Sequence, residues 1–458
     1  MTPGLREPLW PSRIPLCYLT LAFLLCGLMP SRLFPGGGGE IERVSGVQAE
    51  IGTENPEVEQ PGAAVAMTAT APPRNVAVDA YRGLVMLLMM GEVLSFPKVA
   101  QAFPQSLFWR ILSFNQSHVQ WAGMSLHDTI QPGFTFLVGV ALPYSIHSRT
   151  SKGQSFRRQL AHTIWRSLVL IFLGIFLRST ASNQTNFTFE DTLTQIGLGY
   201  TFAFLLAHSR PRWQWTALGA ILFGYWLAWA LYPAPGLNFN WQAAGVPSNW
   251  PHNFTGFASH WNKNSNLGQA FDVWFLNLLP RASRFAYNAG GYLTLSFIPT
   301  LGTMLLGLRA GEWFRSAAPR IPLKRFVIAG LLLAAAGVLL HFTGVCPIVK
   351  RIWTPGWTLF SGGVCFFFLA AFSWVIDVKG YRRWAFPLVV VGMNSIAAYL
   401  IAELWREFIV QSLHIHLGYA VFRVFGAGLE PLMVGIVVML IYWGILYWMY
   451  RKRLFLRI

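Results

Sequence analysis

The chain has 458 residues, of which 54% are hydrophobic and 12% carry a charged side chain, and its mean hydropathy is +0.44. A soluble domain carries about 25% charged residues, so this composition excludes an ordinary soluble domain. The formal charge of +17 does not indicate a nucleic-acid partner, because the basic residues belong to no recognised nucleic-acid fold or stacking platform. The four cysteines are scattered and predict neither a disulfide framework nor a metal site.

The amino-terminal part of the chain differs from the rest. Residues 14–29 form a short apolar run after Arg6 and Arg13, which fits a signal-peptide core, an additional transmembrane helix or a wrongly assigned start. Residues 31–74 are rich in Gly, Pro, Glu and Ala and predict a flexible linker. We therefore expect a signal-like or membrane segment at 1–30, a linker at 31–74 and a transmembrane domain at 75–458.

Apolar stretches recur from residue 75 onward, each of about 17–22 residues, the length that crosses the hydrocarbon of a bilayer. They predict an all-α, polytopic transmembrane bundle of about ten helices, or eleven if residues 14–29 also span. The segment 405–428 is predicted to be interfacial or re-entrant. The predicted helices lie near 77–97, 129–147, 162–178, 193–208, 213–232, 293–311, 325–343, 356–376, 385–404 and 431–450.

Basic residues concentrate in alternate connections between these helices. Ten helices with the first amino end inside place all of these connections on the cytoplasmic face, as the positive-inside rule requires. The other loops then face the non-cytoplasmic side; they are 98–128, 179–192, 233–292, 344–355 and 405–430. Loop 233–292 is rich in Trp and Asn, which suits either sugar recognition or a lid over the membrane domain.

A polar stretch, "HVQWAGMSLHD" at residues 118–128, precedes the second predicted helix on the non-cytoplasmic side. A neutral imidazole can act as a base or as a nucleophile toward a thioester, so His118 is a candidate catalytic residue, although a loop histidine can also be purely structural. Asp128 is expected either to hold the His118 imidazole in one tautomer or to stabilise the start of the following helix. His127 is interpreted as structural or exposed.

Several motifs share one order along the chain: "VDAYRGL", the stretch at 118–128, "LTQIGLGY", "GGYLTLSFIPTLGTMLLGLRAG", "KRIWTPGW" and "GMNSIAAYL". Over residues 75–450 the chain thereby resembles the membrane acetyltransferases related to heparan-α-glucosaminide N-acetyltransferase. The resemblance implies acetyl-CoA as the cytosolic co-substrate, an extracytoplasmic amino sugar or glycan as the acceptor, and a homodimer in the bilayer. It also assigns acetyl transfer to His118. The membrane would be a bacterial inner membrane or a eukaryotic organelle membrane.

Further site residues follow from the same resemblance and from the chemistry of CoA. CoA carries phosphates, for which Arg82 and Arg166 at the inner mouth are candidate contacts. Trp121, Gln195 and Asn394 are candidate substrate contacts, and for Asn394 and Gln195 a buried structural role fits as well.

The chain departs from the family pattern at two places. Glu92 stands near the outer end of the first helix, where the family usually has asparagine, and Thr194-Gln195 replaces a Gln-Arg pair. A polytopic transporter and a catalytically inactive relative are the alternative interpretations. A transporter is expected to contain inverted repeats or helices broken at matching positions, and the sequence contains no convincing repeat.

Overall fold

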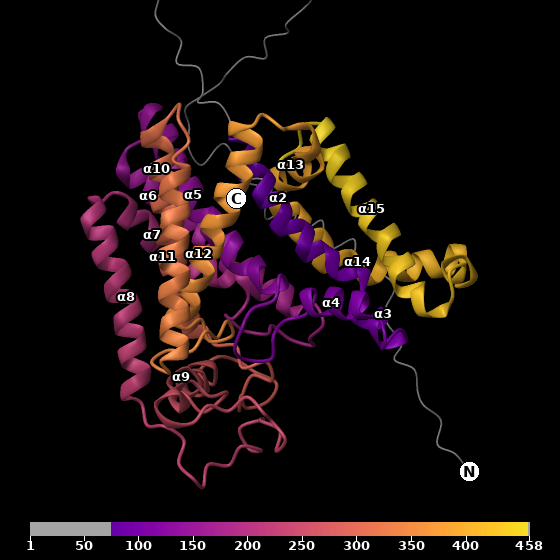
Figure 1. Ribbon diagram of the computed structural model, residues 1–458, viewed down its shortest axis with the longest axis horizontal. Coiled ribbons are helices and arrows are strands. Elements are labelled where there is room, and N and C mark those ends of the chain that lie inside the picture. Colours follow the sequence, from indigo (N-terminus) through magenta and orange to yellow (C-terminus); the bar gives the residue numbers. More distant parts are fainter. Residues whose placement is uncertain (1–74, 457–458) are drawn as a thin grey trace, which may run out of the picture.

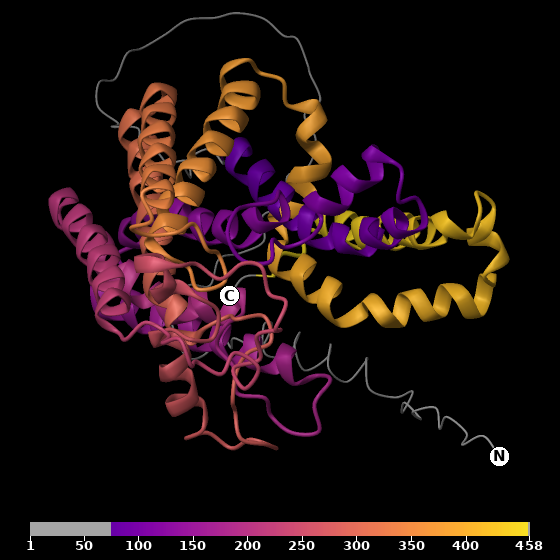
Figure 2. The same ribbon diagram turned by 60° about the horizontal axis from the view of Figure 1, so that its bottom comes forward.

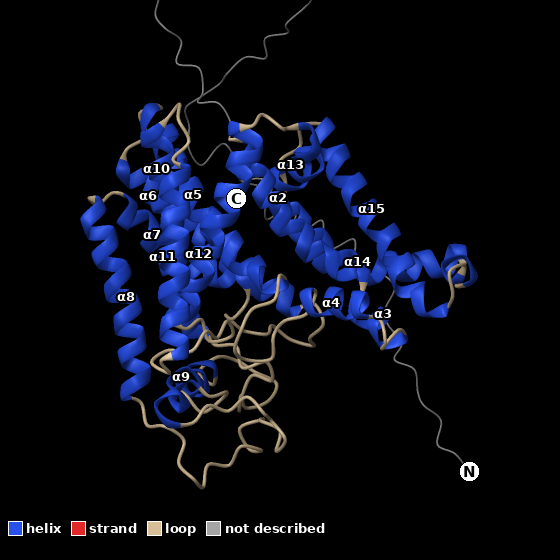
Figure 3. Ribbon diagram, in the orientation of Figure 1, coloured by secondary structure: helices blue, strands red, loops and turns tan. Residues whose placement is uncertain are grey.

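The computed structural model describes residues 75–456. All named secondary-structure elements of this range are helices (Figure 3). The all-α prediction is therefore confirmed for this part of the chain. The segments predicted at 1–30 and 31–74 lie outside the described residues.

The described part contains long helices and several shorter ones. Two 3₁₀ turns matter for the site, η1 (Gly91–Leu94) and η2 (His127–Thr129). The α-helices are α2 (Val76–Met90), α3 (Phe96–Ala102), α4 (Leu107–Asn115), α5 (Ile130–Ser151), α6 (Phe156–Ser179), α7 (Thr192–Ala207), α8 (Pro211–Leu231), α9 (Leu267–Leu276), α10 (Phe297–Ala317), α11 (Leu323–Phe342), α12 (Pro355–Phe372), α13 (Phe386–Met393), α14 (Ser395–Leu417) and α15 (Glu430–Arg451).

Five helical segments of the described chain are long and apolar enough to cross a membrane, and a sixth is added if α13 and α14 form one span. This agrees with a multi-pass membrane protein, whereas the predicted count of about ten spans is not confirmed. Helix α10 shows why the numbers differ, because Arg309 and Glu312 reduce its mean hydropathy. The five segments are Val76–Ala102, Phe156–Ser179, Leu323–Phe342, Pro355–Val378 and Ala427–Arg451.

The single helix predicted at 385–404 is wrong, because α13 and α14 meet at Asn394 with a bend of 70°. The Asn394 Nδ2 donates to the Leu454 carbonyl at 2.9 Å, and its Oδ1 accepts from the Leu456 N–H at 3.2 Å. The amide thus ties the break to the carboxyl-terminal segment. Beyond it, α14 continues to Leu417, so half of the segment predicted to be interfacial or re-entrant is regular helix.

The long loops gather at one end of the helices (Figures 1 and 3), while α14 and α15 project to one side (Figure 2). Side chains connect these loops: Arg281 donates to the Phe187 carbonyl at 2.7 Å, and His252 lies 2.9 Å from Gln120. Loops 98–128, 179–192 and 233–292, which the alternation of basic residues assigned to one face, are therefore neighbours in space.

Helices α5 and α10 pack closely enough that only glycine fits at their contact. A Cβ at Gly307 would overlap the carbonyl oxygen of Phe136, and one at Gly139 would overlap the carbonyl oxygen of Met304. Small residues allow this approach between membrane helices. Gly307, within "LGTMLLGLRAG", is thus a packing residue of this helix pair.

Replacing Gly307 by alanine is expected to separate α5 from α10 and to destabilise the fold by about 1–3 kcal/mol, the usual cost of overpacking. Gly219→Ala on α8 is the matched control, because a Cβ there meets no atom within 4 Å. The measurement is the fraction of monodisperse protein after heating in detergent. Equal heat resistance of the two variants would contradict the packing described above.

Candidate active site

The loop that carries His118 is fixed against two other loops. The Trp121 Nε1 donates to the carbonyl of Trp261 in loop 233–292 at 3.1 Å, and the Gly123 N–H donates to the carbonyl of Ile348 in the loop before α12 at 3.1 Å. Gly123 has φ = 110°, a conformation that glycine adopts far more readily than other residues. The Gly123–Ile348 bond brings residues 117–128 and 348–351 together, although more than 200 positions separate them.

Asp128 is the centre of this loop and is completely buried. Its Oδ2 accepts hydrogen bonds from the Val119 N–H at 3.2 Å, the Ser125 N–H at 3.1 Å and the Ser125 hydroxyl at 3.0 Å. A buried carboxylate is costly unless such donors surround it. The loop therefore folds back around Asp128, as the proposed contact with His118 required.

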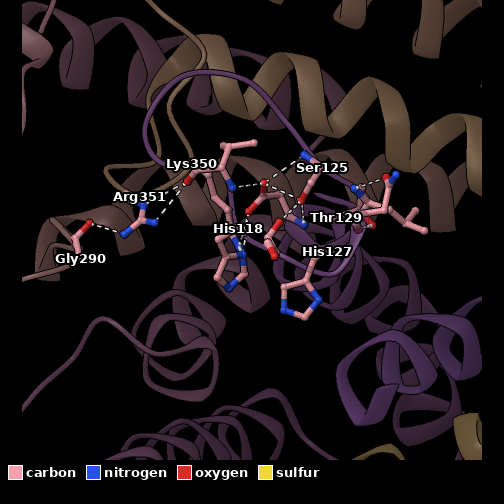
Figure 4. Close-up of polar contacts among 12 residues, drawn as sticks. His118, Ser125, His127, Thr129, Gly290, Lys350 and Arg351 are labelled. Carbon is pink, nitrogen blue, oxygen red and sulfur yellow. Dashed lines mark hydrogen bonds and ion pairs between the residues drawn. The ribbon is translucent and has the colours of Figure 1, made fainter. Parts of the chain in front are cut away.

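His118 and Lys350 share the other carboxylate oxygen of Asp128 (Figure 4). The His118 Nδ1 lies 2.8 Å from Oδ1 and the Lys350 Nζ lies 3.1 Å from it, while Nζ and Nδ1 are 3.0 Å apart. In the tautomer in which Asp128 accepts the Nδ1 proton, the His118 Nε2 keeps its lone pair; in the opposite tautomer Nδ1 would instead accept from the Lys350 Nζ. Nε2 has no hydrogen-bond partner within residues 75–456.

The electrostatics of the three groups favour a neutral imidazole beside two charged neighbours. Burial lowers the pKa of His118 below its ordinary value; the Asp128 hydrogen bond acts in the opposite direction and the Lys350 charge lowers the pKa further. Burial alone would raise the pKa of Asp128, but His118 and Lys350 hold it well below its usual range. Near pH 7 the His118 Nε2 is thus available as a base or nucleophile.

A cavity of about 430 Å³ opens in front of His118. Met86, Met89 and Phe134 form an apolar part of its wall. His127 also lines it, with its ring centre 4.6 Å from that of His118 and its Nε2 3.0 Å from the Glu92 Oε1. His127 was interpreted as structural or exposed, and that interpretation did not foresee that its side chain forms part of the cavity wall.

Carboxylates form another part of the wall. The cavity is lined by Glu92, Glu190, Asp191 and Glu403, together with the cations Arg178 and Lys350. Burial raises the pKa of Glu190 above its ordinary value. Asp191 also caps α7, because its Oδ1 accepts from the Leu193 N–H at 2.9 Å. The described chain contains no group of three or more His, Cys, Asp or Glu side chains suited to a metal ion.

No protein-family model matches the chain. Heparan-alpha-glucosaminide N-acetyltransferase of Homo sapiens is 24% identical over 375 residues, which cover 74% of this chain and 54% of that protein. Its Mus musculus counterpart is 24% identical over 373 residues, which cover 72% and 53% of the two chains. The chain is related to these acetyltransferases at the level of the family. The resemblance drawn from the motifs is confirmed, and the chain spans about half the length of its curated relatives.

The cofactor contacts expected from this acetyltransferase resemblance lie outside the cavity wall. Arg82 pairs with Asp79 at 3.1 Å on α2, ten residues before Glu92 and so about 15 Å along the helix direction. Arg166 on α6 donates to the Tyr200 hydroxyl at 2.9 Å. Their assignment to acetyl-CoA stays a prediction.

The expected substrate contacts also occupy structural positions. Trp121 is buried in the loop contact described above, and Asn394 lies at the break between α13 and α14. The Gln195 Nε2 donates to the carbonyl of Phe189 at 2.6 Å and to that of Thr294 at 3.2 Å, which ties α7 to the loop before α10. Their contact with substrate stays a prediction.

Sequence reasoning missed Lys350 as a site residue. It stands in the motif "KRIWTPGW", but nothing in the local pattern shows that its ammonium group reaches Asp128. The neighbouring Arg351 donates to the carbonyls of Val119 and Gly290 at 3.2 and 2.7 Å, so the same motif also fixes the His118 loop (Figure 4). A lysine buried beside an aspartate is recognisable only from the fold.

The charges around His118 predict opposite pKa changes in two variants. Lys350→Met removes a positive charge and is expected to raise the pKa of His118, whereas Asp128→Asn removes the stabilising carboxylate and lowers it, each by about one unit or more. Diethylpyrocarbonate modifies neutral imidazole, so the pH of half-maximal modification of His118, followed by mass spectrometry, moves up in the first variant and down in the second. Unchanged midpoints, with His416 as the internal reference, would contradict the contacts.

Proposed function

We propose that the chain is an integral-membrane acetyltransferase that moves acetyl from cytosolic acetyl-CoA to an amine or hydroxyl of an extracytoplasmic sugar. The observation that carries the proposal is the arrangement of His118. Its Nδ1 lies against the buried carboxylate of Asp128, and its Nε2 has no hydrogen-bond partner within residues 75–456. The His118 side chain lines the cavity. The relationship to two N-acetyltransferases supports the same reaction class.

His118 acts as nucleophile or as general base. As nucleophile, its Nε2 forms a bond to the thioester carbonyl carbon, the carbon–sulfur bond breaks, and CoA leaves as a thiolate. As base, Nε2 takes the proton of the acceptor while the acceptor attacks the thioester directly, the carbon–sulfur bond breaks, and CoA again leaves as a thiolate. In both routes Asp128 stabilises the cationic imidazole, and the apolar wall around Met86 and Phe134 limits hydrolysis.

An amine is the acceptor that the wall of the cavity favours. The four wall carboxylates Glu92, Glu190, Asp191 and Glu403 outnumber the wall cations Arg178 and Lys350, even with Arg406 beside Glu92 included. A cavity with excess carboxylate attracts a cationic amino sugar and concentrates it near His118.

The proposed reaction also fixes the orientation of the protein in its bilayer. The end that carries the long loops and His118 faces the non-cytoplasmic side, and acetyl-CoA enters from the opposite end past Arg82 and Arg166. We further propose a homodimer. The membrane is a bacterial inner membrane or an organelle membrane.

A transporter is the alternative that one observation favours. The 70° break between α13 and α14 produces the type of discontinuous helix that lines transport pathways. The Asn394 side chain is occupied at this break by the backbone of Leu454 and Leu456, however, so it is not available to a passing solute.

Loss of the imidazole tests the proposed function. Purified protein in lipid nanodiscs receives radiolabelled acetyl-CoA and glucosamine, and the products are acetylated sugar and free CoA. His118→Ala is expected to lower turnover about 10²–10⁴-fold, the usual contribution of a positioned acid–base or nucleophilic group.

His416→Gln is the matched control, because His416 is an exposed histidine at the end of α14 and lies outside the cavity. It is expected to retain wild-type turnover. Full turnover in His118→Ala would remove His118 from the mechanism. Absence of turnover in the wild type, with labelled glucosamine accumulating inside proteoliposomes, would favour the transporter.

A further inference from the structure

A second imidazole–carboxylate pair faces the same cavity as the first. The His127 Nε2 lies 3.0 Å from the Glu92 Oε1, and the ring centres of His127 and His118 are 4.6 Å apart. Both histidines and Glu92 line the cavity of about 430 Å³. Glu92 belongs to the turn η1 after α2, and His127 belongs to the turn η2 before α5.

The two pairs present opposite ring nitrogens. Asp128 contacts the Nδ1 of His118, so the Nε2 of that ring does not face a carboxylate. Glu92 contacts the Nε2 of His127, so there it is the Nδ1 that does not face one. The carboxylate beside Nε2 favours the tautomer that keeps the proton there. Nδ1 of His127 has no hydrogen-bond partner in the described part of the chain.

Charged groups surround this pair on several elements. Arg406 on α14 lies 4.0 Å from the Glu92 Oε2, the His118 ring contacts the His127 ring, and the charges of Glu92 and Lys350 interact. The side chain of His127 is 6% exposed, and that of Glu92 is 46% exposed. Glu92 is thus open to the cavity and balanced by a cation, which suits a carboxylate that stabilises a transient imidazolium.

We propose that His127, held by Glu92, is a second proton-transfer residue that deprotonates the attacking amine, while His118 carries the acetyl group. The inference rests on the proposed acetyltransferase function and adds a base specific to the acceptor. It gives Glu92 a role at the place where the chain departs from the asparagine usual in the resembling family. Glu92 is a positioning residue in this scheme, because it acts through His127.

The second half-reaction balances in atoms and charge. The amine lone pair forms a bond to the acetyl carbon on the His118 Nε2, the carbon–Nε2 bond breaks, and the electron pair returns to the imidazole ring of His118. The proton of the amine passes to the His127 Nδ1 and then to solvent. The products are the acetylated amine, the thiolate released in the first half-reaction and one proton.

Acceptors of different basicity separate this role from a structural one. All three amines lose a proton when they are acetylated. Glucosamine and ethanolamine are the stronger bases, so their adducts give up this proton less readily, whereas hydroxylamine is a weaker base and a strong nucleophile whose adduct can lose the proton to water. His127→Gln is expected to lower transfer to both basic amines about 10²–10⁴-fold, the usual range for a general base. Transfer to hydroxylamine is expected to change little. Ethanolamine controls for the small size of hydroxylamine.

Glu92→Gln tests the positioning role and replaces His127→Gln if that variant fails to fold. It keeps a polar partner but removes the charge that stabilises the imidazolium, so the same selective loss with basic amines is expected. His416→Gln is the control, and the His118→Ala rate is subtracted as background. Equal losses with all three acceptors, or no loss, would overturn the inference. A wild type inactive with every acceptor would instead overturn the proposed function.

Discussion

The buried carboxylate of Asp128 is the constraint on which the site depends. It accepts from the backbone of Val119 and Ser125 and from the side chains of His118 and Lys350. A carboxylate removed from water is stable only when donors and a counter-charge compensate it. Asp128 therefore fixes the fold of its loop, the position of the His118 ring and the approach of the loop before α12 at once.

The site is built on loops, and the loops are held by one another. Arg351 connects the backbone of Val119 to that of Gly290, Trp121 is anchored on Trp261, and Gln195 ties α7 to the loop before α10. Each loop begins at the end of a helix. Close helix contacts such as that of α5 with α10 fix the relative positions of these helix ends. The contacts between loops at this end of the bundle thus hold the site in place.

Sequence reasoning reached the helical class and the separation of loops between two ends, and it offered the pairing of His118 with Asp128 as one of two roles for the aspartate. These follow from hydropathy, alternating basic residues and a short motif, which are all local signals. Lys350 was missed because 232 positions separate it from His118 and only the fold joins them. The break at Asn394 was missed for the same reason, since its partners Leu454 and Leu456 lie 60 and 62 residues away. Glu92 stood out only as a departure from a pattern, and its partner became visible in the structure.

The tautomer of His118 tests the central claim most directly. Protein with ¹⁵N-labelled histidine is examined by NMR above the pKa of His118, and the His118 signals are assigned by their loss in His118→Gln. The arrangement around Asp128 predicts a proton on Nδ1 and an unprotonated Nε2. A proton on Nε2, with Nδ1 unprotonated, would show that Asp128 does not hold the ring and would contradict the account.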